Sequence, residues 1–164
     1  MLEGLTPFAR RLADHILERY PAWGACATTR EIAPGEAREL RFDVPRPGQP
    51  GPELWIRAWY DQEVTVGFGD WHGHPWLPDD SHDRGIAATL ELIDEIVAER
   101  LVIGVKLRKG QVVVARPLRP DGEQHWRRFR RRWLPWFDQC YIRSWRGTYD
   151  REWSSRRSAH PSVR

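Results

Sequence analysis

Two histidines one residue apart form the segment of this sequence best suited to chemistry. His72 and His74 follow an alternating apolar run at residues 64–68, and Asp70 stands between that run and the histidines. Side chains two residues apart share one face of a strand, so we expect Asp70, His72 and His74 to project together if the strand continues that far. Tryptophans flank the pair on both sides. The sequence therefore predicts a binding surface formed by Asp70, Trp71, His72, His74 and Trp76.

Three interpretations of the histidine pair are open at this level. Two imidazoles on one strand face can bind a divalent ion such as zinc, with Asp70 and His82 to complete the ligand set and an open position to activate water. That arrangement would make the protein a metal-dependent enzyme, a hydrolase or an oxygenase. The pair can instead supply hydrogen bonds in a metal-free pocket walled by tryptophans, or bond to neighbouring carboxylates and backbone at a strand end. Because this spacing is a short motif, the expectation is no cofactor and no assigned catalytic residue.

A second segment, near the C-terminus, combines arginines with aromatic residues. Guanidinium groups pair with phosphates and interleaved aromatics stack on unpaired bases, which is typical of single-stranded nucleic-acid binding. The aromatic residues are also spaced three or four apart, the pattern of an amphipathic helix whose arginines face solvent. The helix is the favoured interpretation. Nucleic-acid binding is the alternative, through Trp126, Arg127, Arg128, Arg130 and Arg131.

Length and charge bound the class of protein. The 164 residues predict a single domain over residues 1–153, followed by a flexible tail at 154–164. The net charge of +3 is uneven, with 14 basic and 18 acidic residues in 1–118 against 12 and 5 in 119–164. Two cysteines without CxxC spacing give no zinc or disulfide pattern, and no apolar run approaches the roughly 20 residues of a membrane span. We therefore expect a cytoplasmic protein.

Hydrophobic periodicity predicts an α+β fold built on antiparallel pairing. Apolar residues recur at helical spacing over 6–20 and 84–99, which predicts two amphipathic helices, and Thr6 is suited to cap the first. Alternating and apolar runs predict six strands, at residues 40–44, 53–60, 64–68, 101–107, 111–117 and 139–145. We expect a mainly antiparallel sheet of five or six strands, with the two helices packed on one face and a third, Arg/Trp-rich helix at an edge or across the other face.

Several segments together resemble a known group of proteins. These are residues 64–74 with the acidic loop and helix that follow, the hairpin at 106–109 and the segment 144–150. They are similar to small bacterial α+β proteins often grouped with the immunity proteins of toxin systems, over about residues 53–150. The resemblance implies stoichiometric protein binding rather than catalysis, and it assigns no catalytic residues.

The tryptophan content points in the same direction. Ten tryptophans are more than one core of this size would bury fully, so some should be partly exposed. Exposed tryptophan and arginine are the usual composition of protein-binding hot spots. We therefore expect a non-enzymatic bacterial binding protein, an immunity protein that neutralises a toxin by direct contact. The Trp71 to Trp76 loop and the neighbouring strand face are its expected contact surface.

Overall fold

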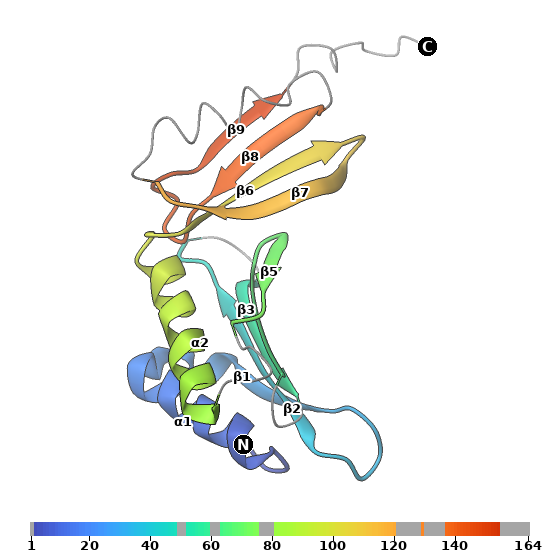
Figure 1. Ribbon diagram of the computed structural model, residues 1–164, viewed down its shortest axis with the longest axis vertical. Helices are drawn as coiled ribbons and strands as arrows, with labels where there is room; N and C mark the ends of the chain where they lie inside the picture. Colours follow the sequence, from blue (N-terminus) through green and yellow to red (C-terminus); the bar gives the residue numbers. More distant parts are fainter. Residues whose placement is uncertain are drawn as a thin grey trace. The chain divides into compact units, whose positions relative to one another are not determined.

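A computed structural model describes residues 2–48, 52–59, 63–75, 81–120, 129 and 137–154 (Figure 1). The chain divides into two compact units, Met1–Asp94 and Glu95–Arg164, and each unit holds one antiparallel sheet. The α+β class and the antiparallel pairing predicted from the sequence are confirmed. The strands form two sheets, of five and four strands, instead of one sheet of five or six. The single domain expected over residues 1–153 stays a prediction.

The first unit begins with two helices and continues into five strands in chain order. The helices are α1 (Pro7–Arg19) and the 3-10 helix η1 (Pro21–Cys26). The strands are β1 (Ala27–Glu31), β2 (Arg38–Pro45), β3 (Pro52–Trp59), β4 (Glu63–Phe68) and β5 (Trp71–Gly73). Each strand pairs antiparallel with the next, so the sheet order is β1-β2-β3-β4-β5.

Helix α1 forms where the sequence predicts it, and for the expected reason. The Thr6 side chain accepts a hydrogen bond from the backbone N–H of Ala9, and Pro7 occupies the first turn, where a missing N–H leaves no bond unmade. Leu12 and Ile16 recur at helical spacing and are fully buried. Since α1 contacts β2, its apolar stripe contributes to the core of the first unit.

The two faces of the five-stranded sheet differ in chemistry because side chains alternate along each strand. Phe42, Ile56 and Val66 are cross-strand partners on β2, β3 and β4, and all three are fully buried. The alternate residues lie on the opposite face, where polar, charged and aromatic side chains predominate. This polar face carries the candidate site.

Helix α2 (His82–Val97) follows β5 and is joined to α1 by polar contacts at two places. Arg11 forms an ion pair with Asp83, and the Tyr20 hydroxyl donates a hydrogen bond of 2.5 Å to Asp94. Burial and this hydrogen bond raise the pKa of Tyr20 to about 12. In the described part of the chain, no helix combines the length and apolar character needed to cross a bilayer.

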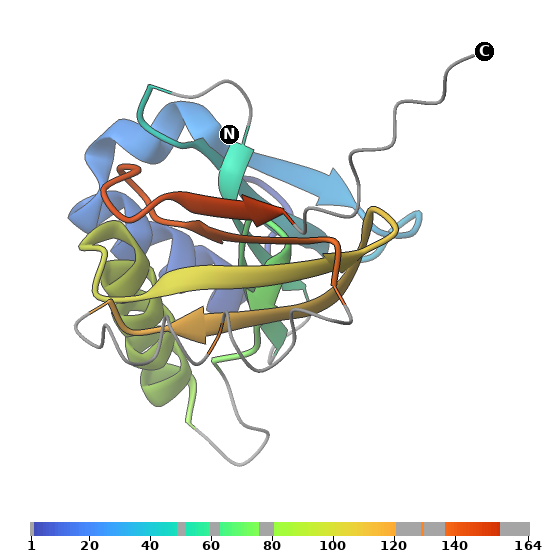
Figure 2. The same ribbon diagram turned by 90° about the horizontal axis from the view of Figure 1, so that it is seen from above.

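The second unit is built on four strands, which Figure 2 shows side by side. They are β6 (Val102–Arg108), β7 (Gln111–Leu118), β8 (Gln139–Arg143) and β9 (Arg151–Ser154), in the order β7-β6-β8-β9. Lys109 and Gly110 connect β6 to β7 with φ angles of 52° and 74°. Two positive φ angles in a row are the geometry of a tight hairpin turn, which the sequence predicts at this position.

Strand β9 was not predicted from the sequence. Arg151, Glu152 and Ser154 are exposed, so the segment lacks the apolar alternation from which a strand is recognised, and only its pairing with β8 defines it. The predicted Arg/Trp-rich helix lies outside the described residues except for Phe129. The predicted tail lies outside them after Ser154.

Candidate binding face

The polar face of the five-stranded sheet carries a tryptophan seated over a glycine. Trp55 on β3 pairs with Gly67 on β4, and Gly67 pairs with His72 on β5, so the three residues form one row across the strands. A Cβ atom placed on Gly67 would lie 2.0 Å from Cε2 of Trp55. The indole therefore occupies the space that a side chain at position 67 would need, and glycine allows it to approach the backbone of β4.

The two predicted histidines lie next to this indole and next to each other. The rings of His72 and His74 have centroids 5.5 Å apart and planes at 84°, an edge-to-face arrangement. The His72 ring lies 6.1 Å from that of Trp55. Nδ1 of His74 is hydrogen-bonded to Oγ1 of Thr65 at 3.1 Å. Both histidines are exposed, so an aromatic surface and imidazole hydrogen-bonding groups face solvent together.

Arg57, on β3, packs beside the Trp55 ring and is bonded to residues of β2. Its Nη1 donates to the carbonyl oxygens of Phe42 and Ile56, each at 2.9 Å, and its Nη2 donates to Asp43 at 2.5 Å. Only 14% of the Arg57 side chain is exposed, and its Cζ lies 5.4 Å from the centre of the Trp55 ring. Such a contact adds a cation–π attraction to the packing of the indole. We refer to Trp55, Arg57, Thr65, His72 and His74 as the indole–imidazole face.

The chain reaches this arrangement by a turn that follows the strand predicted at residues 64–68. Strand β4 ends at Phe68, and Gly69 adopts a φ of 56°, a left-handed conformation that glycine enters at little cost. The N–H of Gly69 donates to the carbonyl of Glu53 at 2.8 Å, and β5 then runs back along β4. The strand predicted at residues 64–68 is confirmed as β4, but it does not continue to the histidines. His72 lies on the return strand and His74 directly follows it, while Asp70 lies in the turn and is exposed.

The tryptophan beside the histidines is Trp55 and not Trp71. Trp71 pairs with Phe68, whose side chain is fully buried, so Trp71 lies on the face of β5 opposite to His72. A Cβ atom on Gly73 would meet Cζ2 of Trp71 at 2.8 Å, which places the Trp71 ring over its own strand. Trp76, the other predicted member of the surface, lies outside the described residues.

The residues proposed as metal ligands are not gathered into one set. Among the described residues, no three His, Cys, Asp or Glu side chains lie close enough together to hold a metal ion. His82, at the start of α2, has its ring 5.3 Å from that of Phe8. The described geometry thus brings His72 and His74 together without adding Asp70 or His82 to form a metal-binding group.

The predicted nucleic-acid residues Trp126, Arg127, Arg128, Arg130 and Arg131 lie outside the described part of the chain. Phe129, from the same segment, is described and buried. A Cβ atom on Gly104 would lie 2.8 Å from its ring, and Nζ of Lys106 lies 4.4 Å from the ring centre. Phe129 therefore packs on strand β6, where it contacts a lysine that is itself buried.

Sequence reasoning missed three members of the face, namely Trp55, Arg57 and Thr65. All three belong to predicted strands, but only the register between strands brings them to the histidines. One signal was present in the sequence. Gly67 interrupts an apolar strand, and a glycine inside a strand often marks a site where another group approaches the backbone closely.

Comparison of the chain with protein-family models, with curated proteins and with solved structures gave no match.

Proposed function

We propose that this is a non-enzymatic binding protein that contacts a protein partner through the indole–imidazole face. The observation that carries the proposal is the position of Trp55, which is held over Gly67 and beside Arg57 while His72 and His74 remain exposed next to it. A tryptophan fixed before binding loses little conformational freedom when a partner covers it. Tryptophan and arginine are also the residue types most enriched at binding hot spots.

The shape of the face supports a protein partner. Its members come from adjacent strands of one sheet, and such a surface is suited to the broad contact of a protein interface. The histidines add hydrogen-bond donors and acceptors around an aromatic centre. Protein interfaces are commonly arranged in this way, with an aromatic core and a polar rim. Truncation of such an anchoring tryptophan weakens binding by about 2 to 4 kcal/mol, roughly 30-fold to 1,000-fold in affinity.

The partner we propose is a bacterial toxin, neutralised in the cytoplasm by direct contact. The similarity of residues 64–74 and 144–150 to toxin-immunity proteins supports this choice, and residues 72 and 74 of the first segment belong to the face itself. We further propose that α1 and α2 cover the apolar face of the five-stranded sheet, which leaves the polar face for the partner. The ion pair between Arg11 and Asp83, which joins the helices, supports this packing.

The test uses the full chain as bait and the product of the adjacent gene as the candidate toxin. Wild-type protein should bind it in calorimetry and protect cells that express it. Trp55→Ala, and the double variant His72→Ala/His74→Ala, should lose affinity within the range given above. Trp59→Ala is the matched control, because Trp59 lies on the same strand and the same face but outside the indole–imidazole face, and it should bind as wild type does.

Two results would count against the proposal. Equal affinity of wild type, Trp55→Ala and the double histidine variant would place the interface elsewhere. Absence of any complex with wild-type protein, together with no protection of cells, would remove the toxin as partner.

A further inference from the structure

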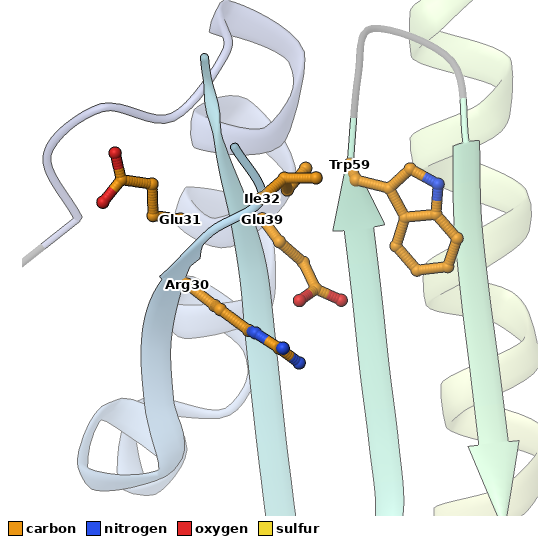
Figure 3. A pocket seen from close by; sticks show the side chains of 5 residues that line it. All are labelled: Arg30, Glu31, Ile32, Glu39 and Trp59. Atoms are coloured by element: carbon orange, nitrogen blue, oxygen red, sulfur yellow. The ribbon is translucent and has the colours of Figure 1, made fainter. Parts of the chain in front are cut away.

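The polar face also carries a cavity, next to Trp59, which lies four residues further along β3 than Trp55. It is an open cavity of about 470 Å³ at the end of β1 and β3 and the beginning of β2, shown in Figure 3. Its volume lies within the range of about 300 to 1,000 Å³ that is typical of small-molecule sites. The lining residues are Arg30, Glu31, Ile32, Glu39 and Trp59.

One positively and one negatively charged side chain line the cavity, on neighbouring strands. Arg30 on β1 and Glu39 on β2 are cross-strand partners, and Figure 3 shows both side chains extending to the same side while Glu31 extends away. Within the described part of the chain, the side chain of Arg30 makes no hydrogen bond or ion pair. Its guanidinium group therefore retains its donors for a ligand.

The Glu39 carboxylate is partly buried but only loosely paired. Its side chain is 14% exposed, and its ion pairs reach Nε of Arg41 and Nε of Arg57 at 3.9 Å each, beyond hydrogen-bond distance. Nε of Arg41 is itself buried without a hydrogen-bond partner in the described structure. The carboxylate thus has unused acceptor capacity toward the cavity, where an additional donor would be well placed.

An apolar wall completes the cavity. The indole Nε1 of Trp59 donates a hydrogen bond of 2.7 Å to Glu63 on the next strand, which orients the ring. Ile32 contributes a large apolar side chain that is 42% exposed. An aromatic ring held by its polar edge, together with an exposed isoleucine, offers a contact for an apolar group of a ligand.

We propose that this cavity binds a small zwitterion, a free α-amino acid with an apolar or aromatic side chain. The ligand carboxylate pairs with the guanidinium of Arg30, the ammonium group donates to the carboxylate of Glu39, and the side chain packs against Trp59 and Ile32. Cross-strand neighbours have Cβ atoms about 4.5 to 5.5 Å apart, so two such side chains can converge on charges carried by one small molecule. The lining of this cavity shares no residue with the indole–imidazole face, and the two sites meet only where Glu39 lies 3.9 Å from Nε of Arg57.

The experiment compares L-phenylalanine with two analogues, each of which lacks one of its two charged groups. L-phenylalanine carries both charges, phenethylamine lacks the carboxylate, and 3-phenylpropanoate lacks the ammonium group. By calorimetry, L-phenylalanine should bind the full-length protein about tenfold or more tightly than either analogue, because each analogue loses one charge-assisted hydrogen bond. Equal affinity for all three probes, or no binding of L-phenylalanine at millimolar concentration, overturns the proposal.

Variants locate the site and separate it from the protein interface. Arg30→Gln changes an exposed side chain, so the fold should be kept, and it should weaken L-phenylalanine binding about tenfold while the weaker binding of phenethylamine stays the same. Trp59→Leu should weaken all three probes. The double variant His72→Ala/His74→Ala should leave L-phenylalanine binding unchanged, so a loss of partner binding and a loss of amino-acid binding can be told apart. Retention of wild-type affinity by Arg30→Gln overturns the assignment.

Discussion

The carboxylate of Glu99 accepts a hydrogen bond of 2.7 Å from the backbone N–H of Arg146, across 47 positions of sequence. Glu99 lies between α2 and β6, is only 8% exposed and has a φ of 57°. Burial on its own would raise the pKa of Glu99. Hydrogen bonds from the Thr148 side chain, the Arg146 N–H and the Ser144 side chain outweigh this effect, so the pKa of Glu99 is lowered. The ionised side chain therefore ties the loop after β8 to the end of α2.

Loss of this carboxylate should destabilise the protein in a pH-dependent way. A carboxyl group with a lower pKa in the folded state contributes stability above its unfolded pKa of about 4.5, and that contribution is lost as the pH falls through the folded value. Glu99→Gln should lower the free energy of unfolding by about 1 to 3 kcal/mol at pH 7, measured by urea denaturation. The gap between variant and wild type should shrink below pH 4.5. Glu91→Gln, at an exposed position of α2, is the control. A stability difference between Glu99→Gln and wild type that does not change with pH would contradict the lowered pKa of Glu99.

A methyl group at position 67 should displace the Trp55 ring. Gly67→Ala places a carbon 2.0 Å from Cε2 of Trp55, so the indole must move or the strands must separate. We expect destabilisation of about 1 to 3 kcal/mol and a changed near-ultraviolet circular dichroism spectrum. Gly24→Ala is the matched control, because its new carbon would meet Cδ2 of Leu17 at 3.9 Å, an ordinary contact. An unchanged spectrum and melting temperature for Gly67→Ala would show that the ring does not lie over β4.

The hydroxyl of Tyr20 should make stability fall at alkaline pH. Its pKa is raised from 10.0 to about 12, so the folded state favours the protonated form, and the contribution is complete below pH 10 and is lost as the pH rises from 10 to 12. Tyr20→Phe should lack this component of the pH dependence. Asp94→Asn should bring the pKa of Tyr20 closer to 10, as measured by ultraviolet absorbance titration. A normal tyrosine titration in the wild type would disprove the contact.

The N-cap of α1 should contribute about as much to the free energy of unfolding as N-caps do in other helices. Thr6→Ala removes the acceptor of the Ala9 N–H and should destabilise the first unit by about 1 kcal/mol in thermal or urea unfolding. Arg10→Ala changes an exposed side chain of the same helix to a strong helix former and should not destabilise it. If both variants unfold like wild type, the hydrogen bond seen at Thr6 contributes nothing to stability.

Local signals were sufficient to predict the elements that form the core. The cap at Thr6 and the spacing of Leu12 and Ile16 define α1, and alternation around Phe42 and Ile56 defines two central strands. The turn at Gly69 could not be predicted in the same way, because the residues after it continue an alternating pattern and only the conformation of glycine reverses the chain.

The sequence predicts a surface around His72 and His74, which stays a prediction, and the structure adds the residues that lie beside them. The spacing of His72 and His74 predicts that they project together, and their ring centroids lie 5.5 Å apart in the structure, with His72 on β5 and His74 directly after it. Their contact with Trp55 depends on the register of three strands, which no single segment encodes. Trp71 lies on the face opposite to His72 for a different reason, because adjacent residues of one strand point to opposite sides.

One ring above β4 fills a volume that two side chains would otherwise share, so positions 55 and 67 constrain each other. A larger residue at 67 is compatible only with a smaller one at 55, and a smaller residue at 55 leaves an empty volume that a side chain at 67 would fill. During evolution, substitutions at position 55 and position 67 should therefore occur together.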